Sequence, residues 1–302
     1  MITTFYSNGK LLLTGEYVVL DGASAIVIPT KYGQTLQVTP SAKEGIHWES
    51  RDENDLVWYT ETFLYQENGI IAYDKNNPVS RTLHKIMMCA KQLNPSFLRD
   101  PQGWAVTTQL DFPRNWGLGT SSTLINNIAQ WAGVDAFTLL AESYGGSGFD
   151  IAAAQHHTPI RYRLLSKKPV VEAIELEWPF KDQLFFVHLN QKQDSKAGIS
   201  VYKKAVVNKD IFNVIDVINQ ELLDCRSIAV FEKLLQRHEE LISETIQIPT
   251  VKSLLFPEYP RSIKSLGAWG GDFVLATGGA NEKDYFRKKG YLTIIDFADM
   301  VK

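Results

Sequence analysis

The most informative segment of the chain reads Pro113-Arg114-Asn115-Trp116-Gly117-Leu118-Gly119-Thr120-Ser121-Ser122-Thr123. It runs into an apolar stretch that predicts a helix beginning near Ser121. Its two glycines permit close backbone approaches, so successive N–H groups can converge on one anion. The hydroxyls are expected to cap the helix, whose positive dipole end attracts a polyphosphate. The segment predicts a nucleotide phosphate site at Pro113, Gly117, Leu118, Gly119, Thr120, Ser121 and Ser122.

The same segment has an ordinary alternative, a loop that ends in a Ser/Thr helix cap. It is not a Walker loop, because no Gly-Lys-Ser/Thr follows the spacer. It is not a Rossmann fingerprint either, because the third glycine and the later ribose-binding acid are missing. If the segment binds phosphate, it therefore does so in a different way.

Two other segments share its character. The first motif, residues 9–20, reads Gly-Lys-Leu-Leu-Leu-Thr-Gly-Glu-Tyr-Val-Val-Leu, and the third, residues 264–272, reads Lys-Ser-Leu-Gly-Ala-Trp-Gly-Gly-Asp. With residues 113–123 as the second motif, they resemble, in order, the three motifs of the GHMP kinases, the superfamily of galactokinase, homoserine kinase, mevalonate kinase and phosphomevalonate kinase. The resemblance spans nearly the whole chain.

Residues 146–154 discriminate within that superfamily. They read Gly-Ser-Gly-Phe-Asp-Ile-Ala-Ala-Ala and are similar to the Gly-Ser-Gly-Phe-Asp-Val-Ala-Ala-Ala signature of phosphomevalonate kinases. Arg161-Tyr162-Arg163 follows at a similar distance in that family. Tyr17 agrees with this resemblance, since mevalonate kinases usually carry histidine there.

The resemblance implies an α+β, two-domain GHMP kinase fold. Residues 1–180 would form the ATP-binding half, similar to ribosomal protein S5 domain 2, and residues 181–302 a ferredoxin-like half. It also implies an ATP- and Mg²⁺-dependent kinase of the mevalonate pathway of isoprenoid synthesis, with phosphomevalonate or mevalonate as acceptor. The alternatives are another GHMP small-alcohol kinase and a GHMP-fold regulator that binds ligand without catalysis.

Two residues carry the implied chemistry. Asp150 occupies the catalytic aspartate position and would accept or orient the acceptor proton. Lys10 would keep Asp150 ionised and contact the transferred phosphate. The structural alternatives are a helix N-cap for Asp150 and an exposed strand lysine for Lys10.

The resemblance also implies which residues bind the metal and which bind the phosphoryl acceptor. Ser121 is the predicted hydroxyl ligand of Mg²⁺, with Glu142 as the nearest carboxylate. The structural alternative for Ser121 is a hydroxyl that only caps the helix, and the alternative for Glu142 is a glutamate that faces solvent on a helix. The acceptor residues implied by the resemblance are Glu16, Tyr17, Ser147, Lys192, Ser195, Lys196, Gly270 and Gly271. A solvated surface loop is the alternative for the two lysines.

Three positions depart from the family pattern. Trp269 replaces a glycine of the third motif, so we expect that loop to lie less close to a bound ligand. Residues 189–196 differ from the family's substrate segment. Leu139 stands where mevalonate kinases place a metal-binding glutamate, eleven residues before the catalytic aspartate.

Composition agrees with an intracellular enzyme. The 302 residues are 44% hydrophobic, enough for a substantial core. The net charge of −3 offers no global basic field for nucleic acid or an anionic membrane. Cys89 and Cys225 lack disulfide or zinc spacing, and no signal peptide or membrane-spanning run is evident. We expect a cytoplasmic monomer or homodimer.

Local patterns predict the main elements. Strands are expected at 10–13, 17–20, 25–29, 34–39, 46–50, 56–64 and 104–109, mostly in antiparallel sheet. Helices are expected at 80–92, where Leu83, Ile86, Met87 and Ala90 have helical spacing, and at 136–143 and 150–155. A strand at 184–189, helices at 211–224 and 227–246, and strands near Phe273 and Tyr291 complete the C-terminal half.

Overall fold

The computed structural model describes residues 1–66, 69–72, 74–99, 102–191, 195–205, 208–267, 269 and 271–302. The chain divides into two compact units. Unit 1 contains residues 1–9, 32–114 and 118–155, and unit 2 contains residues 10–31, 115–117 and 156–302. The predicted domains, residues 1–180 and 181–302, are each continuous in sequence, whereas each of these two units is made of several separate segments. The predicted boundary therefore stays a prediction.

Unit 1 is built on a sheet in the order β5-β4-β3-β6-β2. The strands are β2 (Ala25–Ser41, shared with unit 2), β3 (Ile46–Arg51), β4 (Val57–Gln66), β5 (Gly69–Ala72) and β6 (Gly103–Leu110), and β1 (Thr3–Leu12) pairs with β2. β3 and β6 are parallel, whereas β2–β6, β3–β4 and β4–β5 are antiparallel. The predicted predominance of antiparallel pairing is therefore correct.

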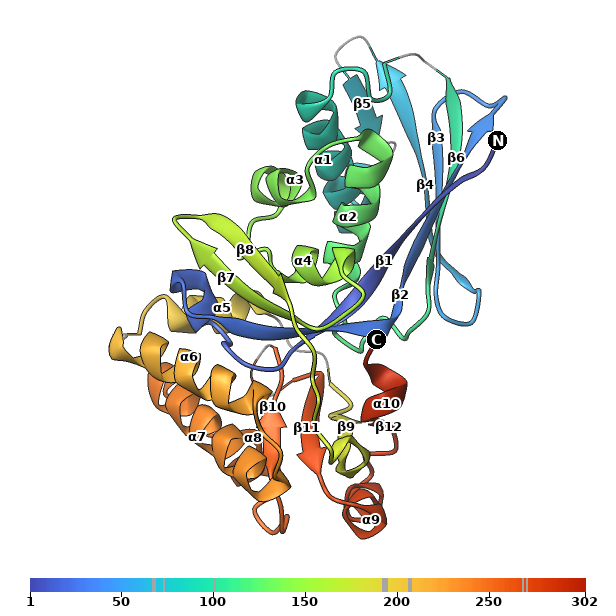
Figure 1. The fold of residues 1–302 in the computed structure, drawn as a ribbon. Coiled ribbons are helices and arrows are strands. Elements are labelled where there is room, and N and C mark those ends of the chain that lie inside the picture. The colour runs from blue at the N-terminus through green and yellow to red at the C-terminus, as the bar shows by residue number, and fades with distance from the viewer. Residues whose placement is uncertain are drawn as a thin grey trace. The chain divides into compact units, whose positions relative to one another are not determined.

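Helices cover one face of this sheet (Figure 1). They are α1 (Pro78–Leu93), α2 (Thr120–Ala132), α3 (Ala136–Ser143) and α4 (Phe149–Gln155). The side chain of Asn77 accepts the N–H of Val79 at 2.8 Å and caps α1. The apolar positions predicted for α1 are buried, and alternate residues of β3 such as Ile46 and Trp48 join the same core.

Unit 2 contains two sheet portions. In one, β2 pairs with β7 (Ile160–Leu165), which pairs with β8 (Lys168–Ala173). The other has the order β10-β11-β9-β12, from β9 (Leu184–His188), β10 (Ile263–Ser265), β11 (Phe273–Thr277) and β12 (Ile294–Asp296). The helices are α5 (Ser195–Tyr202), α6 (Asp210–Leu223), α7 (Ile228–Ile246), α8 (Val251–Leu255), α9 (Ala280–Lys288) and α10 (Phe297–Met300), with short 3₁₀ turns at Val18–Asp21 and Lys181–Gln183.

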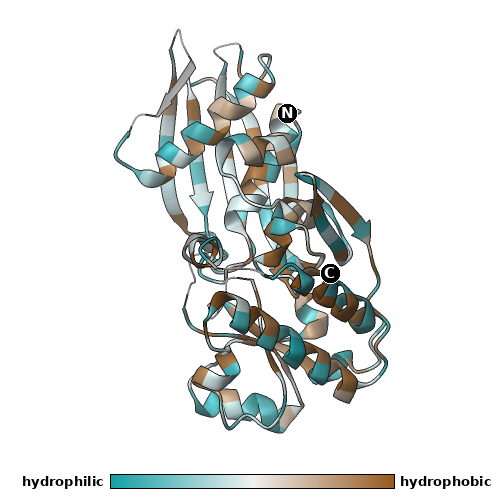
Figure 2. Ribbon diagram, turned by 90° about the vertical axis from the view of Figure 1, so that its left-hand side faces the viewer, coloured by the Kyte–Doolittle hydropathy of each residue, from teal (hydrophilic) through white to brown (hydrophobic). Residues whose placement is uncertain are grey.

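Amphipathic packing explains the helical layer of unit 2. Hydrophobic and hydrophilic residues alternate along the helices in Figure 2. The buried side of α7 carries Phe231, Leu235 and Ile242, and α6 contributes Ile215 and Leu222.

The predicted α+β class is confirmed. None of the described helices combines the length and the apolarity that crossing a bilayer requires.

The structure corrects two local predictions. Residues 17–20 do not form a strand but enter a 3₁₀ helix, because Tyr17 adopts a left-handed φ of 62° and turns the chain. A short apolar run is equally compatible with either structure, which explains the error. The second correction concerns the start of α2. Its N-cap is Gly119, and no side chain caps it.

Candidate active site

The second motif leaves the start of α2 without a side-chain cap. Gly119 precedes the helix with a left-handed φ of 93°, and the hydroxyls of Ser122 and Thr123 donate to the Gly119 carbonyl, at 2.8 and 3.2 Å. These hydroxyls therefore satisfy an acceptor rather than the first-turn N–H groups. Ser121 is exposed, whereas Leu118 is fully buried. The helix start thus offers N–H donors and one exposed hydroxyl, which suits an anion.

The predicted catalytic aspartate lies in the same unit. Asp150 belongs to the first turn of α4 and is partly exposed, with its Oδ1 accepting the N–H of Ile151 at 3.2 Å. α4 packs against α2, and Gln155 donates to Asn126 of α2 at 2.9 Å. Ser147, in the glycine-rich turn before α4, is 9% exposed. The carboxylate is therefore carried by a helix that is fixed to the helix of the second motif.

The carboxylate predicted to complete a metal shell lies in solvent. Glu142 is exposed on α3. Leu139, at the family's glutamate position, is fully buried in the core of unit 1. A carboxylate ligand at that position is therefore absent from this chain.

Residues of all three motifs meet within unit 2. Lys10 of the first motif donates from Nζ to the carbonyl of Gly117, in the second motif, at 2.8 Å. Asp272, at the end of the third motif, lies against the same glycine, since a β-carbon built on Gly117 would be 2.0 Å from its Oδ2. Glycine is required there for this reason and for its φ of 67°. Asp272 had no assigned role in the sequence, although a charged residue directly after two glycines was an available signal.

Residues 115–117 of the second motif, which belong to unit 2, pack against aromatic rings of that unit. The ring of Trp116 lies edge-on to Phe273, with centroids 5.5 Å apart, and 6.5 Å from the ring of His188. The backbone carbonyl of Asn115 lies 3.2 Å from His188 Nε2. These contacts anchor residues 115–117 to β9 and β11.

Glu16, predicted to face the acceptor, is fully buried instead. Its carboxylate pairs with the ammonium of Lys264, which also lies 3.0 Å from Glu239 Oε1. Glu239 accepts the N–H and hydroxyl of Ser265 at 3.0 and 2.9 Å. His238 Nε2 accepts the N–H of Gly15 at 3.0 Å. We call Glu16, His238, Glu239 and Lys264 the buried charge cluster.

The electrostatics of this cluster follow from one ammonium facing two carboxylates. Burial raises the pKa of Glu16 to about 7, and the nearby charge of Lys264 only partly opposes that rise. Burial alone would lower the pKa of Lys264, but the two carboxylates raise it above its usual value. Burial and the Lys264 charge hold the pKa of His238 well below its usual range.

Among the described residues, Glu16, His238 and Glu239 have the spacing of a metal-ligand set, with donor atoms within 4.8 Å of one another. The ammonium of Lys264 contacts both carboxylates, so the cluster already contains its cation.

Tyr17 and Trp269, two residues at which the chain was compared with the family pattern, contact each other. The backbone N–H of Trp269 donates to the hydroxyl of Tyr17 at 3.0 Å, and the ring of Tyr17 stacks on Tyr202 of α5 with centroids 5.9 Å apart. The indole of Trp269 donates to the Pro249 carbonyl and is 2% exposed. Its bulk therefore enters the core of unit 2 rather than projecting from the loop.

Of the other residues predicted to bind the acceptor, most lie at least partly outside the described part of the chain. Gly271 is buried in the bend before β11. Lys192 and Gly270 lie outside the described residues. Ser195 and Lys196 begin α5, but their side chains also lie outside the description.

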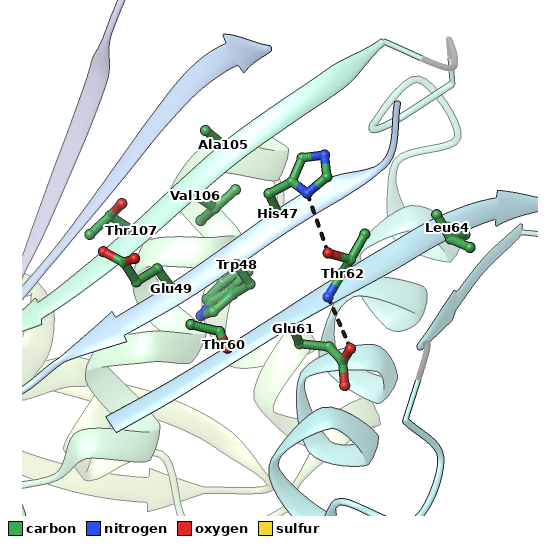
Figure 3. Close-up of a pocket in the computed structure, with 10 residues that line it drawn as sticks. All are labelled: His47, Trp48, Glu49, Thr60, Glu61, Thr62, Leu64, Ala105, Val106 and Thr107. Atoms are coloured by element: carbon green, nitrogen blue, oxygen red, sulfur yellow. Dashed lines mark hydrogen bonds between the residues drawn. The ribbon is translucent and has the colours of Figure 1, made fainter. Parts of the chain in front are cut away.

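A shallow pocket on the sheet of unit 1 contains none of the predicted site residues (Figure 3). Thr62 Oγ1 lies 3.3 Å from His47 Nδ1, and the Thr62 N–H donates to Glu61 at 2.9 Å. No lysine or arginine is among the residues that line it, which are His47, Trp48, Glu49, Thr60, Glu61, Thr62, Leu64, Ala105, Val106 and Thr107. This chemistry does not suit a phosphate.

Comparison with known proteins identifies the fold. Sequence comparison finds no matching family model and no matching curated relative. Solved structures do match. Methanococcus jannaschii mevalonate kinase is 16% identical over 96% of this chain and 94% of its own, with a TM-score of 0.68. Streptococcus pneumoniae phosphomevalonate kinase is 12% identical over 97% of this chain and 99% of its own, with a TM-score of 0.67.

A sugar kinase has the same architecture. Lactococcus lactis galactokinase, solved with galactose, is 13% identical over 95% of this chain and 88% of its own, with a TM-score of 0.64. All three are named members of the superfamily that the sequence motifs resemble, and each match covers nearly the whole chain. The chain therefore has the fold of the GHMP kinases.

Proposed function

We propose that this protein is an ATP-dependent small-molecule kinase that transfers the γ-phosphoryl group to mevalonate or 5-phosphomevalonate. The contacts of Lys10 and Asp272 with Gly117 carry the proposal, because they join three motifs that are remote in sequence at one phosphate loop. The fold is shared with kinases of both acceptors, and the Streptococcus pneumoniae enzyme has been solved with phosphomevalonate and AMPPNP.

The triphosphate would be held at the uncapped start of α2. Phosphoryl transfer needs positioning of the acceptor oxygen and neutralisation of the phosphate oxygens, with little covalent work by the protein. The N–H groups at residues 119–121 would bind phosphate oxygens, and the helix dipole favours the negative charge there. Lys10, which donates to the Gly117 carbonyl, would contact the transferred phosphate as a mobile point charge.

Oxygen donors near this loop fit Mg²⁺, which prefers hydroxyl, carboxylate and phosphate oxygens. The exposed hydroxyl of Ser121 would hold it, with Glu142 as the second ligand predicted from sequence. When bound, Mg²⁺ neutralises charge on the transferred phosphoryl group.

Asp150 would take the proton of the acceptor hydroxyl or orient that hydroxyl toward the γ-phosphorus. It lies in the first turn of α4, where it is partly exposed. The acceptor would be recognised by Ser147, by Tyr17 and by the segment around Lys192, Ser195 and Lys196. The enzyme would work in the cytoplasm.

Two experiments test the proposal. Coupled ADP-release assays with mevalonate, 5-phosphomevalonate, homoserine and galactose identify the acceptor, and inactivity with all of them would favour a ligand-binding regulator. The Asp150→Asn variant should bind nucleotide normally and turn over about two to four orders of magnitude more slowly.

A matched control is Asp135→Asn, which removes a carboxylate at the start of α3 but keeps an oxygen that can accept the N–H of Thr138. It should keep the wild-type rate. A near-normal rate for Asp150→Asn would exclude Asp150 from the mechanism.

A further inference from the structure

The first motif makes a strained turn at Tyr17. The backbone there has a φ of 62° and a ψ of −48°, and the N–H of Val18 donates to the Glu16 carbonyl at 2.7 Å. This is a γ-turn of the rare, strained type, because a residue with a bulky side chain seldom adopts a positive φ. Strained residues of this kind concentrate at functional sites, so what the Tyr17 side chain contacts bears on function.

The hydroxyl of Tyr17 lies between the third motif and α5, and all three segments belong to unit 2. It accepts the backbone N–H of Trp269 at 3.0 Å. A β-carbon built on Gly198 of α5 would lie 2.3 Å from the same oxygen and 2.9 Å from two carbons of the ring. The backbone of α5 therefore rests directly on the Tyr17 side chain, and glycine at position 198 permits this approach.

Tyr202 adds a second contact on the same side of α5. It stands four residues after Gly198, which places both residues on one face of the helix. Its ring stacks on that of Tyr17 with centroids 5.9 Å apart, and its hydroxyl donates to Asp21 at 2.6 Å. Ile199 packs against the hydrophobic cluster in which both tyrosines are buried. The described part of α5 is thus held to the first motif and to the residue that follows it.

The third motif is fixed at the same point. The indole of Trp269 donates to the Pro249 carbonyl at 3.0 Å, and its ring is buried in the same hydrophobic cluster as Tyr17. The backbone N–H that reaches Tyr17 is therefore held by a buried side chain where the family pattern has a glycine. The first motif, the third motif and α5 meet at one side chain, that of Tyr17.

The helix that rests on Tyr17 includes residues predicted to bind the acceptor, since Ser195 and Lys196 belong to α5. A displaced helix would displace these residues, and small displacements of substrate-positioning groups cost large factors in rate. Resting on the kinase function proposed above, we propose that Tyr17 is a positioning residue that fixes α5 against the first and third motifs and thereby sets the efficiency with which the acceptor is used. Gly198 makes the contact possible.

Gly198→Ala tests this contact, because the added methyl group would collide with the Tyr17 hydroxyl. Alanine favours a helix more than glycine does, so without the contact the variant would stabilise α5, whereas the proposal predicts the opposite. Hydrogen exchange at the amides of residues 199–205 should be faster than in the wild type. The kcat/KM for mevalonate or 5-phosphomevalonate should fall about tenfold to a hundredfold, with an unchanged KM for ATP.

Three further variants separate this contact from a general disturbance. The effects of Gly198→Ala should be smaller in a Tyr17→Phe background, because the oxygen nearest to the new methyl group is gone. Tyr202→Leu loses the ring stack without adding a collision, and it should change both measurements in the same direction as Gly198→Ala. Ser200→Ala is the matched control, because it changes an exposed residue of the same helix and should keep the wild-type kcat/KM.

Three results would overturn the inference. Exchange that is unchanged or slower in Gly198→Ala would show that Tyr17 does not hold α5. Faster exchange with an unchanged kcat/KM for the acceptor would mean that the contact serves stability alone. Equal losses for ATP and the acceptor would mean a general disturbance. If the wild type phosphorylated neither acceptor, the kinase proposal would fail, while the exchange comparison would still decide whether Tyr17 holds α5.

Discussion

The start of α2 and the buried charge cluster both contain polar residues of the three motifs, but these residues differ in burial and in what they contact. At α2, Ser121 is exposed and the helix N-terminus has no side-chain cap. In the cluster, Glu16 and Lys264 are fully buried and pair with each other. A motif match identifies the residue types at a site, but burial decides whether they bind a ligand or hold the protein together.

The cluster connects the first and third motifs within unit 2. Glu16 pairs with Lys264, the N–H of Gly267 donates to the Leu12 carbonyl at 3.2 Å, and Trp269 donates to Tyr17. Buried charges are costly unless paired, and removal of one partner leaves the others uncompensated. The following predictions test whether these residues serve stability while those at α2 serve binding.

The largest expected effect is that of Lys264→Met. It leaves two buried carboxylates without their ammonium and should lower the free energy of unfolding by about 3 to 5 kcal/mol. Urea denaturation measures the change. Lys283→Met is the matched control, because Lys283 pairs with the half-exposed Asp296 and should cost no more than about 1 kcal/mol. If both variants lost the same unfolding free energy, the buried pair would contribute no more to stability than the exposed pair, and the prediction would be wrong.

The pH dependence of stability should be the next largest effect. The folded-state pKa of Glu16 is raised from 4.5 to about 7, so the folded protein binds the extra proton and is stabilised at low pH. This contribution, about 3 kcal/mol at most, is complete below the unfolded pKa and is lost as pH rises through the folded value.

The measurement is the difference in unfolding free energy between the wild type and Glu16→Gln from about pH 5 to pH 8. The wild type should lose stability relative to the variant as pH rises. A constant difference, or one of opposite sign, would contradict the raised pKa.

Tyr17→Phe should have an intermediate effect. It leaves the buried N–H of Trp269 without its acceptor, which costs about 1 to 3 kcal/mol of unfolding free energy. Tyr202→Phe should cost less, because its partner Asp21 is exposed and can bind water instead. Chemical denaturation of both variants checks the order, and a larger loss for Tyr202→Phe would show that the contact between Tyr17 and Trp269 contributes little.

The smallest expected effects separate two adjacent hydroxyls. Ser122→Ala removes a hydrogen bond to the Gly119 carbonyl and should lower the unfolding free energy by about 1 kcal/mol. Ser121→Ala should leave unfolding unchanged and instead weaken Mg·AMPPNP binding. Calorimetric titration and urea denaturation of both variants test this, and the reverse pattern would place the ligand-binding hydroxyl at Ser122.

The sequence predicted much of this arrangement because its signals are local. The spacing of Leu83, Ile86 and Met87 indicated α1, and glycines at positions 117 and 119 indicated a turn with positive φ, which both adopt. The strand expected at residues 17–20 is wrong: Tyr17 has a left-handed φ, and its side chain contacts Trp269 and Tyr202, which lie far away in the chain.

The sequence by itself determined the order of the three motifs, the amphipathic helices and the alternating strands, since each depends on residues close together in the chain. Only the tertiary structure decided that Glu16 is buried against Lys264 and that Asp272 lies against Gly117. Burial and long-range contact depend on which distant segments pack together, and residue types and spacing do not encode that locally.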